Sequence, residues 1–206
     1  YFSYKGLTAG NYVVNVTYMG DAKYGANNNT KSFVVSPSTY YELVLTVQNG
    51  TYAQDTVITV SVHENVTNNV TISVDGQNYS RKVDANGIAT LTLNNLSGGV
   101  HTVVATYPGD ALYDPESKSA TFIVGKADSS IDVNFTTPKS VGDDVLVNVS
   151  MHQIINGTVV LSVGDNNYTV IITNGNGSYV LSGLTKGIYN IKASFAGNEN
   201  YTTISS

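Results

Sequence analysis

The chain has 206 residues, a formal net charge of −5 and only 12% charged residues, about half the roughly 25% usual in soluble globular proteins. Its few Lys and Arg residues form no cluster that could neutralise phosphates, which argues against nucleic acid as a partner. It contains no cysteine, which excludes a disulfide framework and a thiolate metal site.

The first segment, residues 1–36, predicts two strands. Every second residue from Tyr12 to Tyr18 is apolar, and a second inward pair, Phe33 and Val35, follows a Gly-Asp turn. Alternation with period 2 is typical of a strand with one buried face. We interpret this segment as the C-terminal strands of a truncated repeat.

The middle segment, residues 37–125, predicts a complete repeat. Apolar residues alternate over 58–62, 70–74 and 91–93, and again over 101–107 and 122–124. Asn-Gly pairs such as Asn86-Gly87 supply turns, because both residues tolerate positive φ. No stretch of ten or more residues has a helical period.

The last segment, residues 126–206, predicts the same strands once more, over 147–151, 159–163, 179–181 and 189–195. We expect it to lack its final strand, the counterpart of 122–124. Two explanations remain open. The chain is a segment of a longer array, or strands from another subunit complete its end repeats in trans.

A shared motif ties the three segments together. Leu-x-x-Gly-x-Tyr, with His in place of Tyr in the middle copy, leads into a strand that ends at an aromatic-x-Gly-Asp or Gly-Asn turn and a further Tyr. Its leucines, Leu7, Leu96 and Leu184, are separated by 89 and 88 residues. Short strands between turn signals predict an all-β protein made of tandem immunoglobulin-like antiparallel β-sandwich repeats of about 89 residues.

The motif also predicts a tyrosine corner, in which a ring is buried and its hydroxyl bonds back to the preceding backbone. Tyr12 and Tyr189 occupy that position, and His101 replaces tyrosine in the middle repeat. We expect Leu96 to be buried, with the repeat motif pointing inward.

The same motif resembles the Ig-like repeats of large prokaryotic adhesin-like surface proteins, those of methanogenic archaea in particular. The resemblance covers essentially the whole chain, with Phe195 and Asn198 as departures in the third copy. It implies a long extracellular protein, attached to a cell wall or membrane through other parts, whose repeats act as stalk or adhesive modules. It implies no catalytic residue.

Asn-x-Ser/Thr sequons, the acceptor sites for N-glycosylation, are unusually frequent. They make glycosylation the strongest chemical hypothesis for this surface. The thirteen candidate asparagines are Asn15, Asn28, Asn49, Asn65, Asn69, Asn78, Asn95, Asn134, Asn148, Asn156, Asn167, Asn176 and Asn200.

Other chemistry has little support in the sequence. His63 and His152 occupy equivalent positions, but without nearby carboxylate pairs we expect solvated histidines and no metal site. Asp21 and Asp110 lie in Gly-Asp turns and are expected to cap them, because no calcium-type Asp-x-Asp-x-Asp loop is present. The nucleophile, zinc-protease and P-loop motifs are all absent, so we expect no enzyme, no catalytic residue and no cofactor.

Two functions remain after these exclusions. One is a structural or adhesive stalk module of a glycosylated cell-surface protein or surface filament. The other is an Ig-like adhesion module that binds a carbohydrate or a protein. The partners expected are neighbouring repeats of the same protein, with host or cell-surface glycans and proteins as further candidates. Few tyrosines stand at outward positions of the pattern, which favours the structural role.

Overall fold

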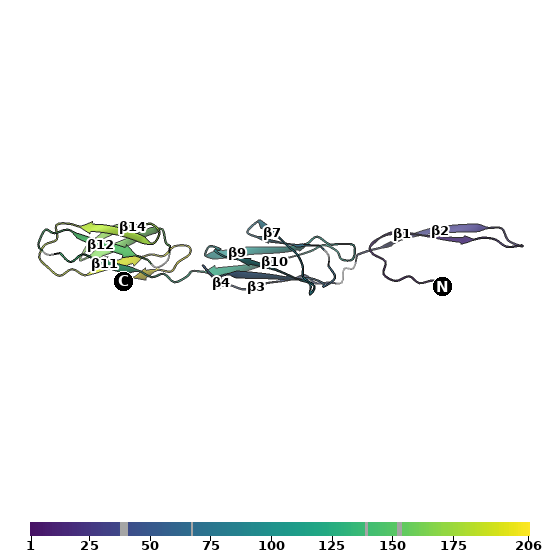
Figure 1. Ribbon diagram of the computed structural model, residues 1–206, viewed down its shortest axis with the longest axis horizontal. Helices are drawn as coiled ribbons and strands as arrows, with labels where there is room; N and C mark the ends of the chain where they lie inside the picture. Colours follow the sequence, from purple (N-terminus) through teal and green to yellow (C-terminus); the bar gives the residue numbers. More distant parts are fainter. Residues whose placement is uncertain (38–40, 67, 139, 152–153) are drawn as a thin grey trace. The chain divides into compact units, whose positions relative to one another are not determined.

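The computed structural model describes residues 1–37, 41–66, 68–138, 140–151 and 154–206 (Figure 1). These residues form strands, turns and loops, with no helix among them. None of them therefore forms a helix that could cross a membrane. By contacts the chain divides into two units. The first consists of Tyr1–Gln48, Thr56–Leu93 and His101–Phe122, and the second of Asn49–Asp55, Asn94–Val100 and Ile123–Ser206.

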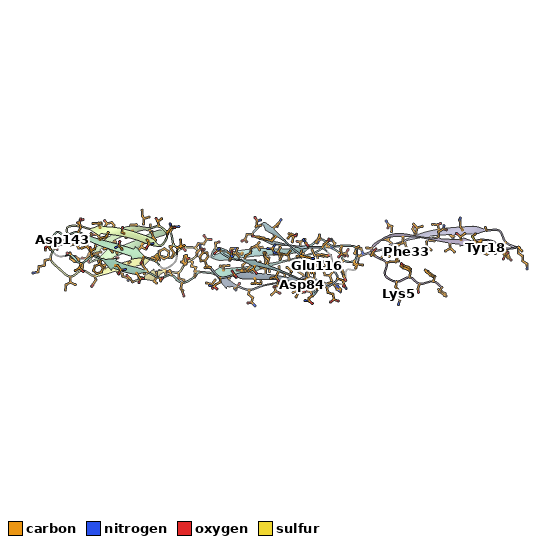
Figure 2. The ribbon with its side chains drawn as sticks, in the orientation of Figure 1. Lys5, Tyr18, Phe33, Asp84, Glu116 and Asp143 are labelled. Carbon is orange, nitrogen blue, oxygen red and sulfur yellow. The ribbon has the colours of Figure 1, made fainter. Side chains whose placement is uncertain are left out.

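The first unit begins with a long hairpin of β1 (Gly10–Tyr18) and β2 (Asn27–Val35), paired antiparallel with Tyr12 opposite Phe33 (Figures 1 and 2). Their rings stack at 5.6 Å. Because side chains alternate across a strand, Tyr12 shares its face with Val14, Val16 and Tyr18. This face is largely exposed, and Val16 retains 64% of its accessible surface.

The middle repeat is a sandwich of two sheets. One sheet contains β3 (Val44–Val47), β5 (Thr56–Ser61) and β8 (Ile88–Leu93), in that order. The other has the order β4-β10-β9-β6-β7. Its members are β4 (Gly50–Thr51), β6 (Val70–Val74), β7 (Gln77–Arg81), β9 (Gly99–Tyr107) and β10 (Glu116–Gly125).

The core of this sandwich comes from the inward residues of facing strands. In β5 the side chains of Ile58 and Val60 are fully buried, while Val57, which precedes Ile58 and points to the opposite face, is 50% exposed. Ile72 of β6 and Val103 of β9 are buried from the other sheet. Burial of these apolar faces is the main force that holds the two sheets together.

The third repeat, in the second unit, has the same arrangement. One sheet has the order β11-β12-β15 and the other β14-β13-β16-β17. The strands are β11 (Asp132–Phe135), β12 (Val145–Ser150), β13 (Gly157–Val163), β14 (Asn166–Ile172), β15 (Asn176–Leu181), β16 (Ile191–Phe195) and β17 (Ile204–Ser205). Its core is built on Val147, Val159, Leu161 and Ala193, all fully buried.

The predicted fold class is confirmed: the chain is all-β, with immunoglobulin-like antiparallel sandwiches. The predicted repeat boundaries, 1–36, 37–125 and 126–206, stay predictions. At the expected position of the last strand of the third repeat, the two-residue strand β17 pairs with β16 through Phe195 and Ile204.

Leu96, which was expected to be buried, is only half-buried, as are Leu7 and Leu184. Each lies in the loop before a strand rather than on the inner face of a sheet, and Leu184 packs against the core of the third repeat.

Candidate functional site

Three equivalent turns, called Gly-Asp turns below although the third has Gly-Asn, cap their own backbone through the Asp or Asn side chain. They lie at residues 20–24, 109–113 and 197–201. Oδ1 of Asp110 accepts hydrogen bonds from the amides of Leu112, at 2.7 Å, and Tyr113, at 3.0 Å. Asp21 accepts from Lys23 and Tyr24, both at 2.8 Å. The turn-capping role predicted for Asp21 and Asp110 is therefore confirmed.

Electrostatics agree with this capping role. The pKa of Asp21 lies below its ordinary value because the Tyr18 hydroxyl bonds to the carboxylate and the amides of Lys23 and Tyr24 do the same. The same contact with Asp21 raises the pKa of Tyr18. Oδ2 of Asp110 receives the hydroxyl of Tyr107 at 2.5 Å. Both oxygens of Asp110 thus bond to their own turn or to the strand before it.

An aromatic cluster closes one end of the middle repeat. The ring of Tyr41 packs edge-on against Tyr107 at 6.0 Å and against Tyr113 at 5.4 Å, and its hydroxyl donates to the carbonyl of Asp114 at 2.7 Å. Burial, followed by the nearby charge of Glu116, raises the pKa of Tyr41 to about 12. Glu116 itself accepts the amide of Leu43 at 3.1 Å. These contacts pin the first residues of the repeat to its last strand.

His63 belongs to the same cluster, which corrects the prediction of a solvated histidine. Its ring stacks on Tyr113 at 4.8 Å, and Nδ1 lies 2.8 Å from the Tyr113 hydroxyl. Nδ1 also accepts the amide of Asn65 at 3.2 Å. The second histidine of that prediction, His152, lies outside the described residues. No group of three or more His, Asp or Glu side chains that could hold a metal occurs in the described part of the chain.

The tyrosine corner is confirmed for the hydroxyl groups but not for the rings. The hydroxyl of Tyr12 donates to the carbonyl of Thr8 at 2.7 Å, and that of Tyr189 to Thr185 at 3.2 Å. Both rings are partly exposed, and Tyr189 keeps 37% of its surface accessible. His101 at the corresponding position is buried instead and stacks on Phe122 at 5.3 Å.

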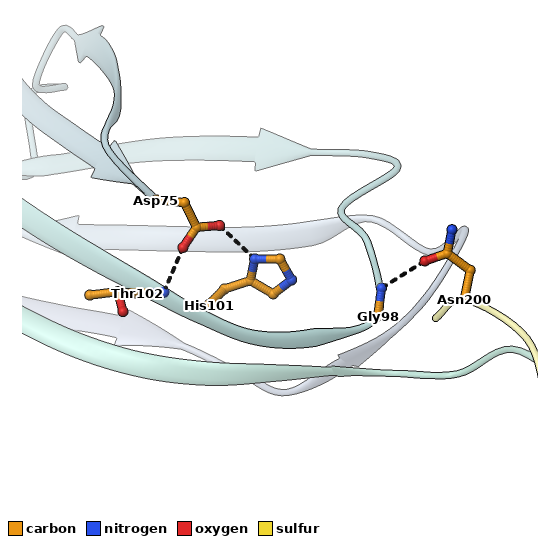
Figure 3. Close-up of polar contacts among 5 residues, drawn as sticks. All are labelled: Asp75, Gly98, His101, Thr102 and Asn200. Atoms are coloured by element: carbon orange, nitrogen blue, oxygen red, sulfur yellow. Dashed lines mark hydrogen bonds and ion pairs between the residues drawn. The ribbon is translucent and has the colours of Figure 1, made fainter. Parts of the chain in front are cut away.

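His101 has a partner that the sequence alone did not reveal. Its Nδ1 lies 2.6 Å from Oδ2 of Asp75, whose Oδ1 accepts the amide of Thr102 at 2.9 Å (Figure 3). The repeat pattern does hold a signal for this pair. The third repeat has Tyr189 at the position of His101 and Gly164 at the position of Asp75. The histidine and the aspartate therefore occur together in the middle repeat and are both replaced in the third.

Twelve of the thirteen sequon asparagines are exposed, and only Asn200 is half-buried. They are distributed over strands and turns of every segment rather than gathered at one place. Oδ1 of Asn200 accepts the amide of Gly98 at 2.8 Å (Figure 3), and Oδ1 of Asn49 accepts that of Ile123 at 2.8 Å. These bonds leave the amide nitrogen, the atom to which a glycan is attached, out of the contact.

The polar side-chain contacts described above therefore lie at turns, corners and strand ends, where they hold the backbone in place. The buried side-chain nitrogen and oxygen atoms in the described regions all have hydrogen-bond partners.

Comparison with known proteins gives one family match. Residues 43–125 match the model of the bacterial Ig-like domain, group 3. This agrees with the sandwich topology of the middle repeat. A comparison with curated protein sequences gives no significant match.

Solved structures with related folds have low identity. A bacterial ice-binding adhesin is 16% identical, with a TM-score of 0.34, over 83% of this chain and 65% of that one. A chimeric tandem of titin Z1Z2 domains is 15% identical, with a TM-score of 0.29, over 81% and 95%. A structure named "Putative membrane anchored protein" from Corynebacterium diphtheriae is 12% identical, with a TM-score of 0.33, over 91% and 64%. The chain thus spans about two thirds of the adhesin structure.

Proposed function

We propose that this chain is an extracellular structural or adhesive stalk module of a glycosylated cell-surface protein. The observation that carries the proposal is the exposure of twelve of the thirteen sequon asparagines on a scaffold of immunoglobulin-like sandwiches. A glycan is bulky and hydrophilic, and it needs an exposed acceptor. The family match of residues 43–125 supports the same class of module.

The disposition of the polar side chains supports a non-catalytic role. Asp21, Asp110 and Asn198 cap their own turns, and His63 and His101 are held by Tyr113 and Asp75. A general base must reach the substrate, and His101 is buried. The resemblance to adhesin-like proteins of methanogenic archaea suggests the kind of surface on which the module functions.

The alternative is a carbohydrate- or protein-binding adhesion module. A sugar-binding sandwich stacks its ligand on exposed aromatic rings. In the described part of the two sandwiches the tyrosines of the middle repeat pack against one another, as Tyr41 does with Tyr107 and Tyr113. Phe135 is 54% exposed and stands on β11 without a neighbouring ring contact among the described residues. This distribution favours the structural role.

Glycopeptide mass spectrometry of the protein from its source organism tests the proposal. We expect glycans at several of the twelve exposed sequons and none at Asn68 or Asn86, which are exposed but lie outside any sequon. Unmodified asparagine at all thirteen positions in surface-exposed protein would overturn the glycosylated part of the proposal. A glycan array with the same chain distinguishes the alternative, because saturable binding of one sugar class would favour the adhesion module.

A further inference from the structure

Two loops of the middle repeat belong to the second unit by their contacts. The ring of Tyr52, from the loop Asn49–Asp55, packs edge-on against Tyr201 at 5.2 Å. From the loop Asn94–Val100, the amide of Gly98 donates to Oδ1 of Asn200 at 2.8 Å (Figure 3). Both loops therefore contact the Gly-Asp turn at residues 197–201. A side chain at Gly98 would overlap the carbonyl oxygen of Glu199.

The first unit contains the same kind of contact. The amide of Ala9 donates to the carbonyl of Ala111 at 2.8 Å. In the repeat register Ala9 corresponds to Gly98, and Ala111 corresponds to Glu199. The loop before the penultimate strand thus meets a Gly-Asp turn twice in this chain. In the first unit that loop carries a side chain at the contact and bonds to a main-chain carbonyl.

The third repeat presents the same two loops once more, at residues 140–144 and 183–188. Val141 takes the position of Tyr52 and Lys186 that of Gly98. Val141 is 70% exposed and Ile188 is 99% exposed. With Pro138, Leu184 and Tyr189 these loops line a pocket of about 210 Å³ within the second unit.

The turn at residues 20–24 has the features that such loops contact. Asp21 caps it through Lys23 and Tyr24, as Asn198 caps the turn of the third repeat through Asn200 and Tyr201. Tyr24, which corresponds to Tyr201, is 68% exposed, whereas Tyr201 is buried. The turn carries Asp21 and Lys23, and the loops carry Asp143, Asp144 and Lys186, so each surface has groups that can pair with opposite charges on the other.

We propose that the loops 140–144 and 183–188 form a docking surface for the Gly-Asp turn 20–24 of a second copy of this chain. Lys186 would follow the geometry of Ala9 and donate its amide to the carbonyl of Ala22, the residue that corresponds to Ala111. Val141 would pack against the ring of Tyr24. The proposal names a partner surface for the structural role proposed above and rests on that role. Glycosylation and folding of the modules do not depend on it.

Cross-linking of single-cysteine variants tests this docking, because the chain has no cysteine of its own. Lys186→Cys is mixed with Ala22→Cys and allowed to oxidise. A direct N–H···O=C bond between two residues brings their Cα atoms within the range that a disulfide spans. We expect the heterodimer to form about tenfold faster than with Asn86→Cys as partner, because docking raises the effective concentration of the two thiols. Asn86 is an exposed turn residue and provides the matched control.

A second substitution separates docking from other association. Val141→Asp, added to Lys186→Cys, should reduce the rate to that of the control pair. Ile171→Asp, at a position that is 72% exposed in the same unit, should leave the rate unchanged. Association through the apolar face of the hairpin would be insensitive to Val141. Equal rates for Ala22→Cys and Asn86→Cys, or no effect of Val141→Asp, would overturn the proposal and leave the proposed structural function standing.

Discussion

The carboxylate of Asp75 lies 2.6 Å from Nδ1 of His101, at the corner where the other repeats place a tyrosine. Asp75 lies in the turn after β6 and His101 in β9, so the pair joins two neighbouring strands at their ends. His101 is buried against Phe122, whereas the side chain of Asp75 is 46% exposed. The pair therefore links two strands at this position, whereas the hydroxyl of Tyr189 in the third repeat bonds to Thr185 in the loop before it.

The first prediction concerns the acid stability of this corner. The hydrogen bond from His101, followed by the amide of Thr102, lowers the pKa of Asp75 from its ordinary 3.8. A lowered folded-state pKa means that the stabilisation is present above pH 3.8 and is lost as the pH falls through the lower, folded-state value. Because the carboxylate is half-exposed, we expect Asp75→Asn to cost only about 0.5–1 kcal/mol at pH 5.

Thermal unfolding between pH 5 and pH 2 measures this effect. The difference between the parent chain and Asp75→Asn should shrink as the pH drops below 3.8. Asp165→Asn, in the corresponding turn of the third repeat, provides the control and should show little difference at any of these pH values. A difference for Asp75→Asn that stays constant to pH 2 would contradict the assignment.

The second prediction concerns the tyrosine corner of the third repeat. Tyr189→Phe removes the hydrogen bond to Thr185 while it keeps the ring. A net contribution of about 0.5–1.5 kcal/mol is usual for such a bond, and partial exposure of Tyr189 favours the lower half of that range. Chemical denaturation measures the loss. Tyr168→Phe should be close to neutral, because the Tyr168 hydroxyl has no hydrogen-bond partner among the described residues.

Most strands could be predicted from the sequence because their inner faces are apolar at every second residue, as in β5 and β13. The strands β3, β4, β7, β11 and β14 were not predicted. β7 is an edge strand of mostly polar residues, Gln77–Arg81, in which no apolar alternation is visible. In β14 the exposed Ile171 lies between the inward residues Val170 and Ile172. The three apolar residues in a row hide the alternation of the strand.

The candidate site was predictable only where the contacts are local in sequence. Asp110 caps amides two and three residues ahead, so its turn motif predicts the contact. Asp75 and His101 are 26 residues apart, and Tyr113 and His63 are 50 apart. Such pairs depend on how the strands between them are placed, which the sequence of one strand does not specify.

The third prediction distinguishes the contributions of the two carboxylate oxygens of Asp110 to stability. Asp110→Ala removes both amide caps and the bond from the Tyr107 hydroxyl. We expect a loss of about 1–3 kcal/mol, because donors beside a buried ring would be left unpaired. Asp110→Asn should cost clearly less, since Asn198 makes the same two amide bonds in the third repeat, both at 2.9 Å. Equal losses in chemical denaturation would show that the caps contribute nothing.

The fourth prediction tests the core of the second unit. Leu161→Ala in β13 removes a fully buried side chain and should cost about 2–5 kcal/mol through lost burial and the cavity left behind. Leu146→Ala, in the same unit at 38% exposure, should cost less than about 1 kcal/mol. Guanidinium unfolding of both variants measures the contrast. Similar losses would mean that the inner face of β13 is assigned wrongly.

The last prediction follows from two sequon asparagines that face each other. Asn134 of β11 and Asn148 of β12 are directly paired across the antiparallel strands, and both are exposed. Directly opposed residues have Cβ atoms only about 4.5–5.5 Å apart. Two bulky glycans cannot easily be attached so close together on one face of a sheet. If the surface is glycosylated as proposed, occupancy of one asparagine should therefore hinder modification of the other.

Intact-glycopeptide mass spectrometry of protein from a glycosylating host measures this competition. Molecules with both asparagines occupied should be fewer than the product of the two single occupancies predicts. Asn134→Gln should raise the occupancy of Asn148, because the competing site is removed while the strand is kept. The matched control is Asn78→Gln, which lies on β7 in the other unit and should leave Asn148 unchanged. Independent occupancy of Asn134 and Asn148, with no response to Asn134→Gln, would contradict the steric argument without bearing on the other eleven sequons.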